Sequence, residues 1–239
     1  MNIIITMGGL GSRFRKAGYT IPKYKIEVNR KTLFEWSMIS LEDFKTEKFI
    51  FVVRKEDKSQ LFISRKCESL GIEDYRVVEL ERLTKGQAET VHLAIPYCDG
   101  NEAIFIYNID TYVEAGQMTI DKITGDGFIP CFKGDGDHWS FVKLDDHEKV
   151  IEIREKIRIS DYCTIGAYYF RTAKMFRDIY DVLYVKNKYL EQGEQYVAPM
   201  YNWMIKQGLN VRIQNIESKF VRVLGTPEEV ESFKISGNT

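Results

Sequence analysis

The sequence predicts an α/β fold with a mainly parallel mixed sheet flanked by helices and an antiparallel extension. The first observation is that, up to residue 107, short runs of β-branched and aromatic residues alternate with segments of helical pattern. This order is typical of parallel strands joined by helical crossovers on both faces of a sheet. The second observation is that strand-like segments follow one another after residue 127 with only short turns between them, which favours antiparallel pairing.

The individual elements follow from hydrophobic patterning and turn residues. In the first part we expect strands at residues 2–6, 49–53, 75–78 and 103–107, and helices at 33–45, 57–70 and 86–97. In the second part we expect strands at 127–133, 138–144, 149–154, 162–170 and 210–216, and helices at 173–184 and 195–207. Because no linker-like stretch or repeat interrupts the chain, we expect one domain over residues 1–239.

The composition excludes several classes of partner. With 34 basic and 35 acidic residues and a net charge of −1, the chain has no electrostatic basis for binding nucleic acid or a membrane surface. No apolar run approaches the roughly 18 residues that a membrane span needs, and the start of the chain lacks the pattern of a signal peptide. The four cysteines form no C-x-x-C pair, as expected for buried thiols in a reducing compartment. We therefore expect a cytoplasmic protein.

A glycine-rich turn, Gly8-Gly9-Leu10-Gly11-Ser12-Arg13, directly follows the first expected strand. Glycines allow backbone amides to close around phosphate oxygens, and the guanidinium group of Arg13 suits a polyphosphate. Lys23 follows Pro22 on a stiffened loop and adds a second cation. A tight surface turn is the alternative to an anion site, but two cations beside three glycines have little structural purpose.

Two other nucleotide-binding motifs fit this turn poorly. A Walker A loop is excluded because G-x-x-x-x-G-K-[ST] occurs nowhere in the chain. A dinucleotide-binding fingerprint fits only in part, since Arg13 and Phe14 stand where its third small residue belongs. Its ribose-binding acid is also missing, because Arg54 ends the second expected strand.

Taken with Lys23, the turn resembles the G-G-x-G-x-R…P-K signature of the sugar-nucleotidyltransferase (nucleotide-sugar pyrophosphorylase) superfamily. Further segments resemble the motifs of that family in order and spacing: residues 84–88, 107–110, 139–142, 153–156, 160–161, 166–170, 193–199 and 225–229. The resemblance is strongest to small nucleotidyltransferases of capsular and surface-polysaccharide pathways, which favours CTP as the nucleotide. It implies a Rossmann-like, GT-A-type fold with a nucleotide-binding half at 1–126 and an acceptor-binding half at 127–239.

The implied reaction transfers an NMP group from an NTP to a phosphorylated small-molecule acceptor and releases pyrophosphate. An acceptor phosphate is already an anion and needs no general base, which agrees with three histidines that lie outside these motifs. The resemblance implies nucleotide contacts at Gly8, Gly9, Gly11, Ser12, Gly86 and Gln87. It implies catalytic cations at Arg13, Lys23 and Lys156, substrate contacts at Asn108, Glu155 and Glu194, and a Mg²⁺ or Mn²⁺ ligand at Asp110.

The sequence departs from the family pattern at two places. Family members commonly have an aspartate before the late Gly-Thr pair as a second metal ligand, but residues 221–224 contain no carboxylate. We therefore expect water and phosphate oxygens to complete the metal shell around Asp110. Ile157 stands where sugar-specific members usually have proline, which favours an acceptor other than a sugar phosphate, such as phosphocholine or a phosphorylated amino-acid amide.

Several alternatives stay open at the level of sequence. Within the family these are the uridylyl-, guanylyl- and thymidylyltransferases of sugar 1-phosphates. Outside it, a metal-dependent glycosyltransferase of related fold would carry D-x-D, which Asn108-Ile109-Asp110 matches in part. The missing carboxylate before Gly225 also allows a non-catalytic nucleotide-binding subunit. The oligomeric state, a homodimer included, is not determined by the sequence.

Overall fold

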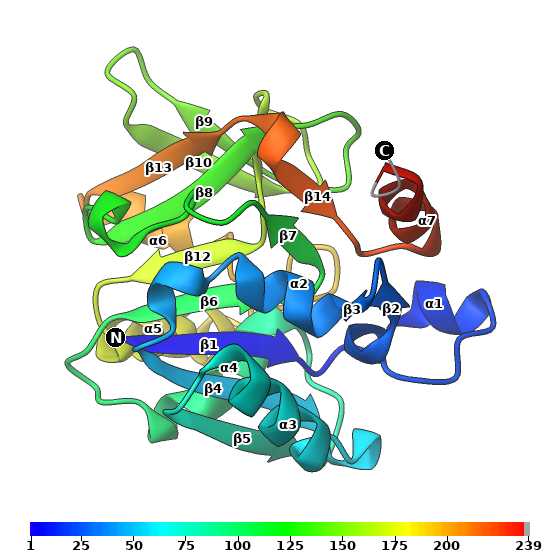
Figure 1. Ribbon diagram of the computed structural model, residues 1–239. Helices are drawn as coiled ribbons and strands as arrows, with labels where there is room; N and C mark the ends of the chain where they lie inside the picture. Colours follow the sequence, from blue (N-terminus) through cyan, green and yellow to red (C-terminus); the bar gives the residue numbers. More distant parts are fainter. Residues whose placement is uncertain (237–239) are drawn as a thin grey trace.

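A ten-stranded mixed sheet runs through the computed structural model, which describes residues 1–236 (Figure 1). Four neighbouring strands are parallel: β1 (Asn2–Met7), β4 (Lys48–Arg54), β5 (Tyr75–Leu80) and β6 (Ile104–Asn108). β1 and β4 are buried almost throughout, which explains their continuous apolar sequences. All four strands begin and end within two residues of the predicted positions.

Helices cover both faces of this parallel part, as predicted. α2 (Leu33–Ile39) and α3 (Gln60–Leu70) contribute to one core with Ile3 and Ile5 of β1. α4 (Gln87–Ala94), α5 (Ala173–Tyr180) and α6 (Met200–Lys206) contribute to a second core with Ile4. Because successive side chains of a strand point to opposite faces, β1 supplies residues to both cores. The predicted α/β class with a mainly parallel sheet is therefore confirmed.

The antiparallel extension is formed by the second half of the chain. Its strands are β8 (Gly127–Lys133), β9 (Ser140–Leu144), β10 (Val150–Glu155), β11 (Tyr162–Thr164) and β12 (Ala167–Phe170). β13 (Val211–Ile216) joins this part as well but pairs with β8 in parallel. β11 and β12 both run antiparallel to β8, β12 along its first residues and β11 along its last. The sheet therefore divides into two branches at β8. β12 pairs with β6 of the parallel part, whereas β11 pairs with β9 of the extension.

The single strand predicted at 162–170 is interrupted in the structure. Gly166 lies between β11 and β12 with φ 78°, and a Cβ at this position would be 2.3 Å from Nδ2 of Asn108. The close approach of Asn108 therefore requires a glycine here, and the strand breaks at this point.

A smaller lobe joins the start and the end of the described chain. It contains α1 (Ser12–Lys16), β2 (Glu27–Val28), β3 (Lys31–Thr32), β7 (Thr111–Val113), β14 (Val221–Val223) and α7 (Pro227–Ser236). Phe14 and Leu33 pack there with Leu224 and Val230 in a third apolar cluster. Figure 1 shows α1, β2, β3 and α7 at the same end of the molecule. These short elements were not predicted, because none of them has a long hydrophobic pattern.

Several α-helices are shorter than predicted, and 3₁₀ or π-helical turns occupy the rest of the predicted ranges. The 3₁₀ turns are Lys23–Lys25, Glu42–Phe44, Lys55–Asp57, Ile95–Tyr97, Ile120–Lys122 and Ser218–Phe220, and Asp181–Lys186 is π-helical. The helix predicted at 195–207 was wrong in its first turn, since α6 begins at Met200. Gln195 lies outside the helix because its main chain bonds instead to Lys85 and Ala88.

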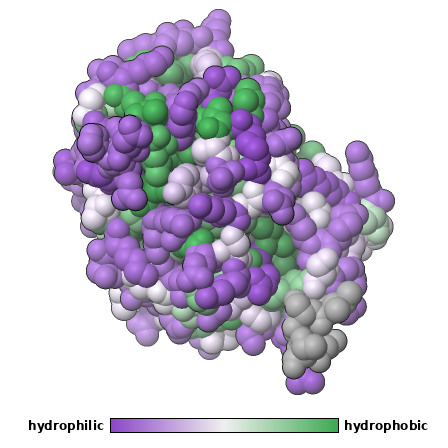
Figure 2. All heavy atoms as spheres, turned by 90° about the horizontal axis from the view of Figure 1, so that it is seen from above, coloured by the Kyte–Doolittle hydropathy of each residue, from purple (hydrophilic) through white to green (hydrophobic). Residues whose placement is uncertain are grey.

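Hydrophilic residues cover most of the face shown in Figure 2, with smaller hydrophobic areas between them. Within residues 1–236, none of the helices is both long and apolar enough to pass through a bilayer.

Candidate active site

A cavity of about 710 Å³ opens at the carboxyl ends of β1 and β6. The strand order reverses here, because the chain moves from β1 through β4 to β5 on one side and places β6 on the other. Ligands of α/β sheets bind at such a switch point. The wall includes most of the predicted site residues: Gly8, Gly9, Ser12, Arg13, Lys23, Gly86, Gln87, Asn108, Asp110, Glu155 and Glu194. Thr164 and Gly166, where the sheet divides, also line it.

The glycine-rich turn lies at the mouth of this cavity between β1 and α1. Gly11 lines an adjoining pocket of about 230 Å³ together with Arg13 and Lys23. Of the three glycines, only Gly11 has a left-handed conformation, with φ 61°. Gly8 is needed for a different reason, since a Cβ there would be 2.8 Å from Cδ1 of Leu80. The turn thus brings backbone and the exposed Arg13 side chain to the cavity edge.

Lys23 and Asp110 form an ion pair across the cavity, with 2.5 Å between Nζ and Oδ2. The two side chains retain 21% and 24% of their exposure, so both are accessible to a ligand. Asp110 lies in the turn that follows β6. Its main-chain carbonyl accepts a hydrogen bond from the Leu224 amide, at 2.8 Å. Within residues 1–236, no cluster of three or more His, Cys, Asp or Glu side chains could hold a metal ion.

Gln87 and Asn108 are hydrogen-bonded to each other, with 2.6 Å between Nε2 and Oδ1. Gln87 opens α4 and Asn108 ends β6. Nε2 of Gln87 also lies 3.3 Å from Oγ1 of Thr6 in β1. The side-chain amides of Gln87 and Asn108 therefore form one polar group at the ends of β1 and β6. The sequence had predicted a separate nucleotide contact for Gln87 and a substrate contact for Asn108.

The loop before α4 is tied to the loop before α6 by two main-chain hydrogen bonds. The amide of Gln195 donates to the carbonyl of Lys85, and the amide of Ala88 donates to the carbonyl of Gln195, each at 2.9 Å. Gly86 lies between them with φ 148°, and a Cβ there would be 2.5 Å from the Gln195 carbonyl oxygen. The predicted nucleobase loop and the loop that carries Glu194 are therefore joined at Gly86.

Glu155 lies at the far wall of the cavity, where it is buried beside Ser140. Burial raises the pKa of Glu155, while hydrogen bonding from the Ser140 hydroxyl and the charge of Lys156 oppose this effect. The Nζ of Lys156 is 4.0 Å from Glu155 and 2.6 Å from the hydroxyl of Tyr196. Partial burial lowers the pKa of Lys156, but the hydrogen bond to Tyr196 and nearby carboxylates outweigh it and raise that pKa.

Lys156 itself is not part of the cavity wall, and Tyr196 stands at the wall in its place. Lys156 has a left-handed backbone with φ 54°, and its amide donates to the Trp139 carbonyl at 2.8 Å. Its ammonium group donates to the hydroxyl of Tyr196, and the side chain keeps 36% of its exposure. Glu194 does line the cavity and is exposed.

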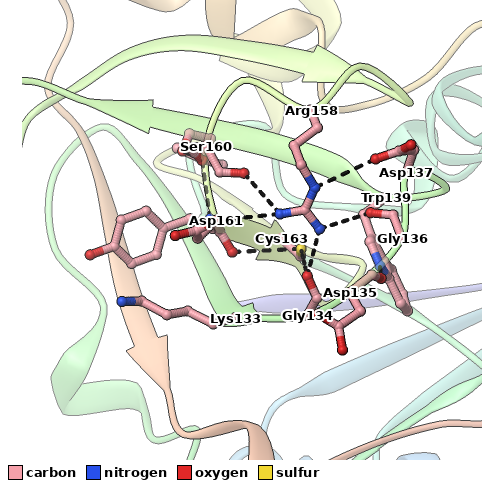
Figure 3. A network of polar contacts seen from close by, with 12 residues as sticks. Lys133, Gly134, Asp135, Gly136, Asp137, Trp139, Arg158, Ser160, Asp161 and Cys163 are labelled. Atoms are coloured by element: carbon pink, nitrogen blue, oxygen red, sulfur yellow. Dashed lines mark hydrogen bonds and ion pairs between the residues drawn. The ribbon is translucent and has the colours of Figure 1, made fainter.

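Figure 3 shows a network around Arg158 that fixes the loop before β9. The guanidinium group donates to the carbonyls of Gly134 and Gly136, at 2.7 and 2.8 Å, and pairs with Asp137 at 3.5 Å. It also lies over the ring of Phe141, 4.8 Å from its centroid. The loop ends at Trp139, whose indole nitrogen donates to the carbonyl of Asp135 in the same loop, at 2.8 Å.

The cavity wall also contains residues that the sequence did not indicate: His138, Trp139, Ser140, Tyr196 and Glu229. The ring centroids of His138 and Trp139 are 4.1 Å apart, so two aromatic rings lie together at the cavity wall. Trp139, Ser140, Tyr196 and Glu229 fall within the family-like segments, which was the one signal available. His138 lies in the loop before β9, because that strand begins at Ser140, two residues after its predicted start.

Comparisons with known proteins agree with this architecture. The nucleoside-diphosphate-sugar pyrophosphorylase from Vibrio cholerae RC9 is 36% identical, with a TM-score of 0.89, and the match covers 98% of this chain and 100% of that chain. The inositol-1-phosphate CTP transferase from T. maritima shares the fold at 18% identity and a TM-score of 0.79, over 99% of this chain and 94% of that chain. No model of a known protein family matches the chain.

A curated relative adds a second sequence match. The D-glycero-alpha-D-manno-heptose 1-phosphate guanylyltransferase of Campylobacter jejuni subsp. jejuni serotype O:2 is 28% identical over 184 residues, which are 74% of this chain and 79% of that protein. Fold and cavity define a Rossmann-like nucleotide-binding protein. With the Vibrio match over nearly its whole length, the chain belongs to the sugar-phosphate nucleotidyltransferase superfamily, and nucleotidyl transfer to a phosphorylated acceptor is the activity that this membership supports.

Proposed function

We propose that the protein transfers CMP from CTP to a phosphorylated small-molecule acceptor, with release of pyrophosphate, in capsule or surface-polysaccharide biosynthesis. The observation that supports this best is the shared cavity, which is lined by the glycine-rich turn and Arg13 together with Glu155 and Glu194. Residues 1–126 would then bind the nucleotide and residues 127–239 the acceptor, within a single domain.

The chemistry requires two anions to meet in line at the α-phosphorus of the nucleotide. Arg13 would hold the β- and γ-phosphates and stabilise the leaving pyrophosphate, as cations at developing charges do. Lys23 would bridge the α-phosphate and the acceptor phosphate, while Lys156, hydrogen-bonded to Tyr196, would attract the acceptor phosphate. Holding both reactants in one cavity supplies the orientation on which such a transfer depends. The acceptor phosphate attacks as an anion, so no residue needs to remove a proton.

Gly86 and Gln87 would border the base, with the backbone of Gly8, Gly9, Gly11 and Ser12 around the rest of the nucleotide. Asn108 and Glu194 would contact the polar groups of the substrates, and Glu155 would orient Lys156. Apart from Lys156, each of these residues lines the cavity or its adjoining pocket. This common location supports the proposed roles.

Asp110 would hold a Mg²⁺ or Mn²⁺ ion, and the structure fits such a role. Its Oδ2 faces the cavity and already accepts a cation, the Lys23 ammonium at 2.5 Å. Oxygen ligands are what Mg²⁺ prefers, and it is usually bound by one or two carboxylates together with phosphates and water. When bound, the ion would neutralise charge on the phosphates. With Asp110 holding a metal ion, the Lys23 ammonium would contact phosphate oxygens.

The choice of CTP rests on likeness to the small capsular cytidylyltransferases in segments 139–142, 153–156 and 193–199. The exposed Ile157, in place of proline, supports an acceptor that is not a sugar. Phosphorylated glutamine is our preferred acceptor, which would make the protein a CTP:phosphoglutamine cytidylyltransferase. GTP with a heptose 1-phosphate is the direct competitor, because the curated relative carries that name.

Pyrophosphate release tests this proposal when CTP, UTP, GTP, ATP and dTTP are each combined with phosphoglutamine, phosphocholine and several sugar 1-phosphates in Mg²⁺. We expect release with CTP and one of the two acceptors that are not sugars. Release only with GTP and a sugar 1-phosphate would show that the nucleotide is GTP and not CTP, and that the acceptor is a sugar phosphate. Free nucleoside diphosphate from a nucleotide-sugar donor, without pyrophosphate from any NTP, would instead identify a glycosyltransferase.

A further inference from the structure

The strand that precedes Gly225 carries no carboxylate, but a carboxylate from the following helix reaches the same place. Glu229 lies in the first turn of α7 and is half-buried. It lines the main cavity together with Asp110 and Gly225. Figure 1 shows α7 directly after β14 at the end of the molecule where α1 lies. The cavity therefore has a second carboxylate on the side of Asp110.

Gly225 separates the two carboxylates and leaves the space between them open. A Cβ built on Gly225 would lie 3.4 Å from Oδ2 of Asp110 and 3.6 Å from Oε2 of Glu229. Both oxygens thus face one small volume. Gly225 is not among the glycines with positive φ, so its backbone conformation does not require a glycine. Its missing side chain instead leaves room for a ligand between two acidic groups.

Hydrogen bonds hold Glu229 in this orientation. The amide of Gly225 donates to its Oε2 at 2.9 Å, and the Glu229 amide donates to Oγ1 of Thr226 at 3.2 Å. The amide of Leu224 ties the same segment to the carbonyl of Asp110 at 2.8 Å. A carboxylate has two oxygens and about four acceptor positions, so the bond from Gly225 leaves most of its capacity unused.

We propose that Glu229 supplies the second carboxylate of the metal site, in place of the aspartate that residues 221–224 lack. This inference rests on the proposed function, in which a divalent cation assists nucleotidyl transfer. Two carboxylates with phosphate oxygens and water match the way Mg²⁺ is usually bound in proteins. The Lys23 ammonium pairs with Asp110, so this carboxylate already faces a positive charge, and with Glu229 it would hold the divalent ion.

Binding of Mn²⁺ to the protein tests the proposal. It is measured at a fixed CTP concentration and without acceptor, as the loss of the free Mn²⁺ electron paramagnetic resonance signal beyond the loss that CTP alone causes. Glu229→Gln removes the charge but keeps an acceptor for the Gly225 amide, so the start of α7 stays intact. We expect this variant to bind Mn²⁺ about tenfold more weakly or worse, the usual loss when a partner in a metal site is changed. The matched control is Glu228→Gln, an exposed neighbour outside the main cavity, which binds like wild type.

A second variant tests the same proposal if Glu229→Gln does not fold. Gly225→Ala places a methyl group at ordinary contact distance from both carboxylates, so it fills the metal space without a backbone clash and weakens Mn²⁺ binding as well. Wild-type Mn²⁺ affinity in both variants would overturn the role of Glu229, while pyrophosphate release by the wild-type enzyme would leave the proposed function standing. No Mn²⁺ binding by the wild-type protein would overturn the metal site, and only the further absence of pyrophosphate release would overturn the proposed function as well.

Discussion

At the scale of single residues, Arg13 and Lys23 stand out because both reach the cavity and its adjoining pocket. Arg13 is exposed, and Lys23 is held only by a carboxylate that itself faces the cavity. Their position is thus better explained by a bound polyphosphate than by a contribution to the fold.

Arg13→Ala and Lys23→Ala are each expected to lower turnover by about 10²–10³-fold, the range found when one preorganised donor at a developing charge is removed. Steady-state pyrophosphate release measures this effect, and thermal unfolding should show little change. Arg15→Ala is the matched control, an exposed arginine of α1 that does not line the cavity. Near wild-type turnover in both cavity variants would contradict the mechanism.

Glu155 predicts a dependence of stability on pH. Because burial raises its pKa, the folded protein binds this proton more tightly than the unfolded chain does. Stability from this group is therefore fully present below the ordinary glutamate pKa and is lost as pH rises through the raised pKa of the folded state. Each pKa unit corresponds to about 1.4 kcal/mol.

Glu155→Gln removes this titration and keeps an acceptor for Ser140. At pH 4 the variant and the wild type should have the same melting temperature. At pH 7 the variant should melt at a higher temperature, by about 2–4 °C for each kcal/mol of stability. Its turnover should fall, because Lys156 loses its partner. Melting curves from pH 4 to 8 measure the difference. A difference that is constant over this range would show that Glu155 titrates normally.

At the scale of elements, the contact at Gly86 couples the two loops that flank the cavity. In Gly86→Ala the new Cβ would meet the Gln195 carbonyl oxygen at 2.5 Å with φ 148°, so one loop must move. We expect a loss of about 1–3 kcal/mol in stability, typical of strained backbone, and higher KM values for both substrates. Gly100→Ala is the control, since nothing lies within 4 Å of its Cβ position. Unchanged KM values would mean that the loops are independent.

Arg158 acts on the acceptor half through the loop of residues 134–139 (Figure 3). Arg158→Lys keeps the charge but loses the planar fork that reaches Gly134 and Gly136 together. We expect the acceptor KM to rise about tenfold or more while the nucleotide KM stays within about twofold, because a small misplacement of a contact residue has large effects. Arg154→Lys serves as the control. An equal rise of both KM values would indicate general loosening instead.

At the scale of the whole molecule, the long strands were the most predictable part. The apolar sequences of β1 and β4 are dictated by burial on both faces, so their bounds could be inferred from residue type alone. The break at Gly166 and the late start of α6 at Met200 could not, because each depends on a distant partner, Asn108 in one case and Lys85 in the other.

The candidate site shows the same division. The glycine-rich turn and Asp110 follow directly from strands and were predictable as strand-end residues. Glu229 and His138 were not, since their approach to the cavity depends on how α7 and the loop before β9 pack. The sheet that joins the two halves also explains why residues from both line one cavity.

The most direct test of nucleotidyl transfer in this cavity is ³¹P NMR of the wild-type enzyme with CTP, phosphoglutamine and Mg²⁺. The account predicts that CTP signals are replaced by equal amounts of pyrophosphate and a new phosphoanhydride that joins the α-phosphate to the acceptor phosphate, and that chelation of Mg²⁺ prevents both. If neither CTP nor any other NTP gave such an anhydride with any phosphorylated acceptor of the panel, the central claim would be contradicted.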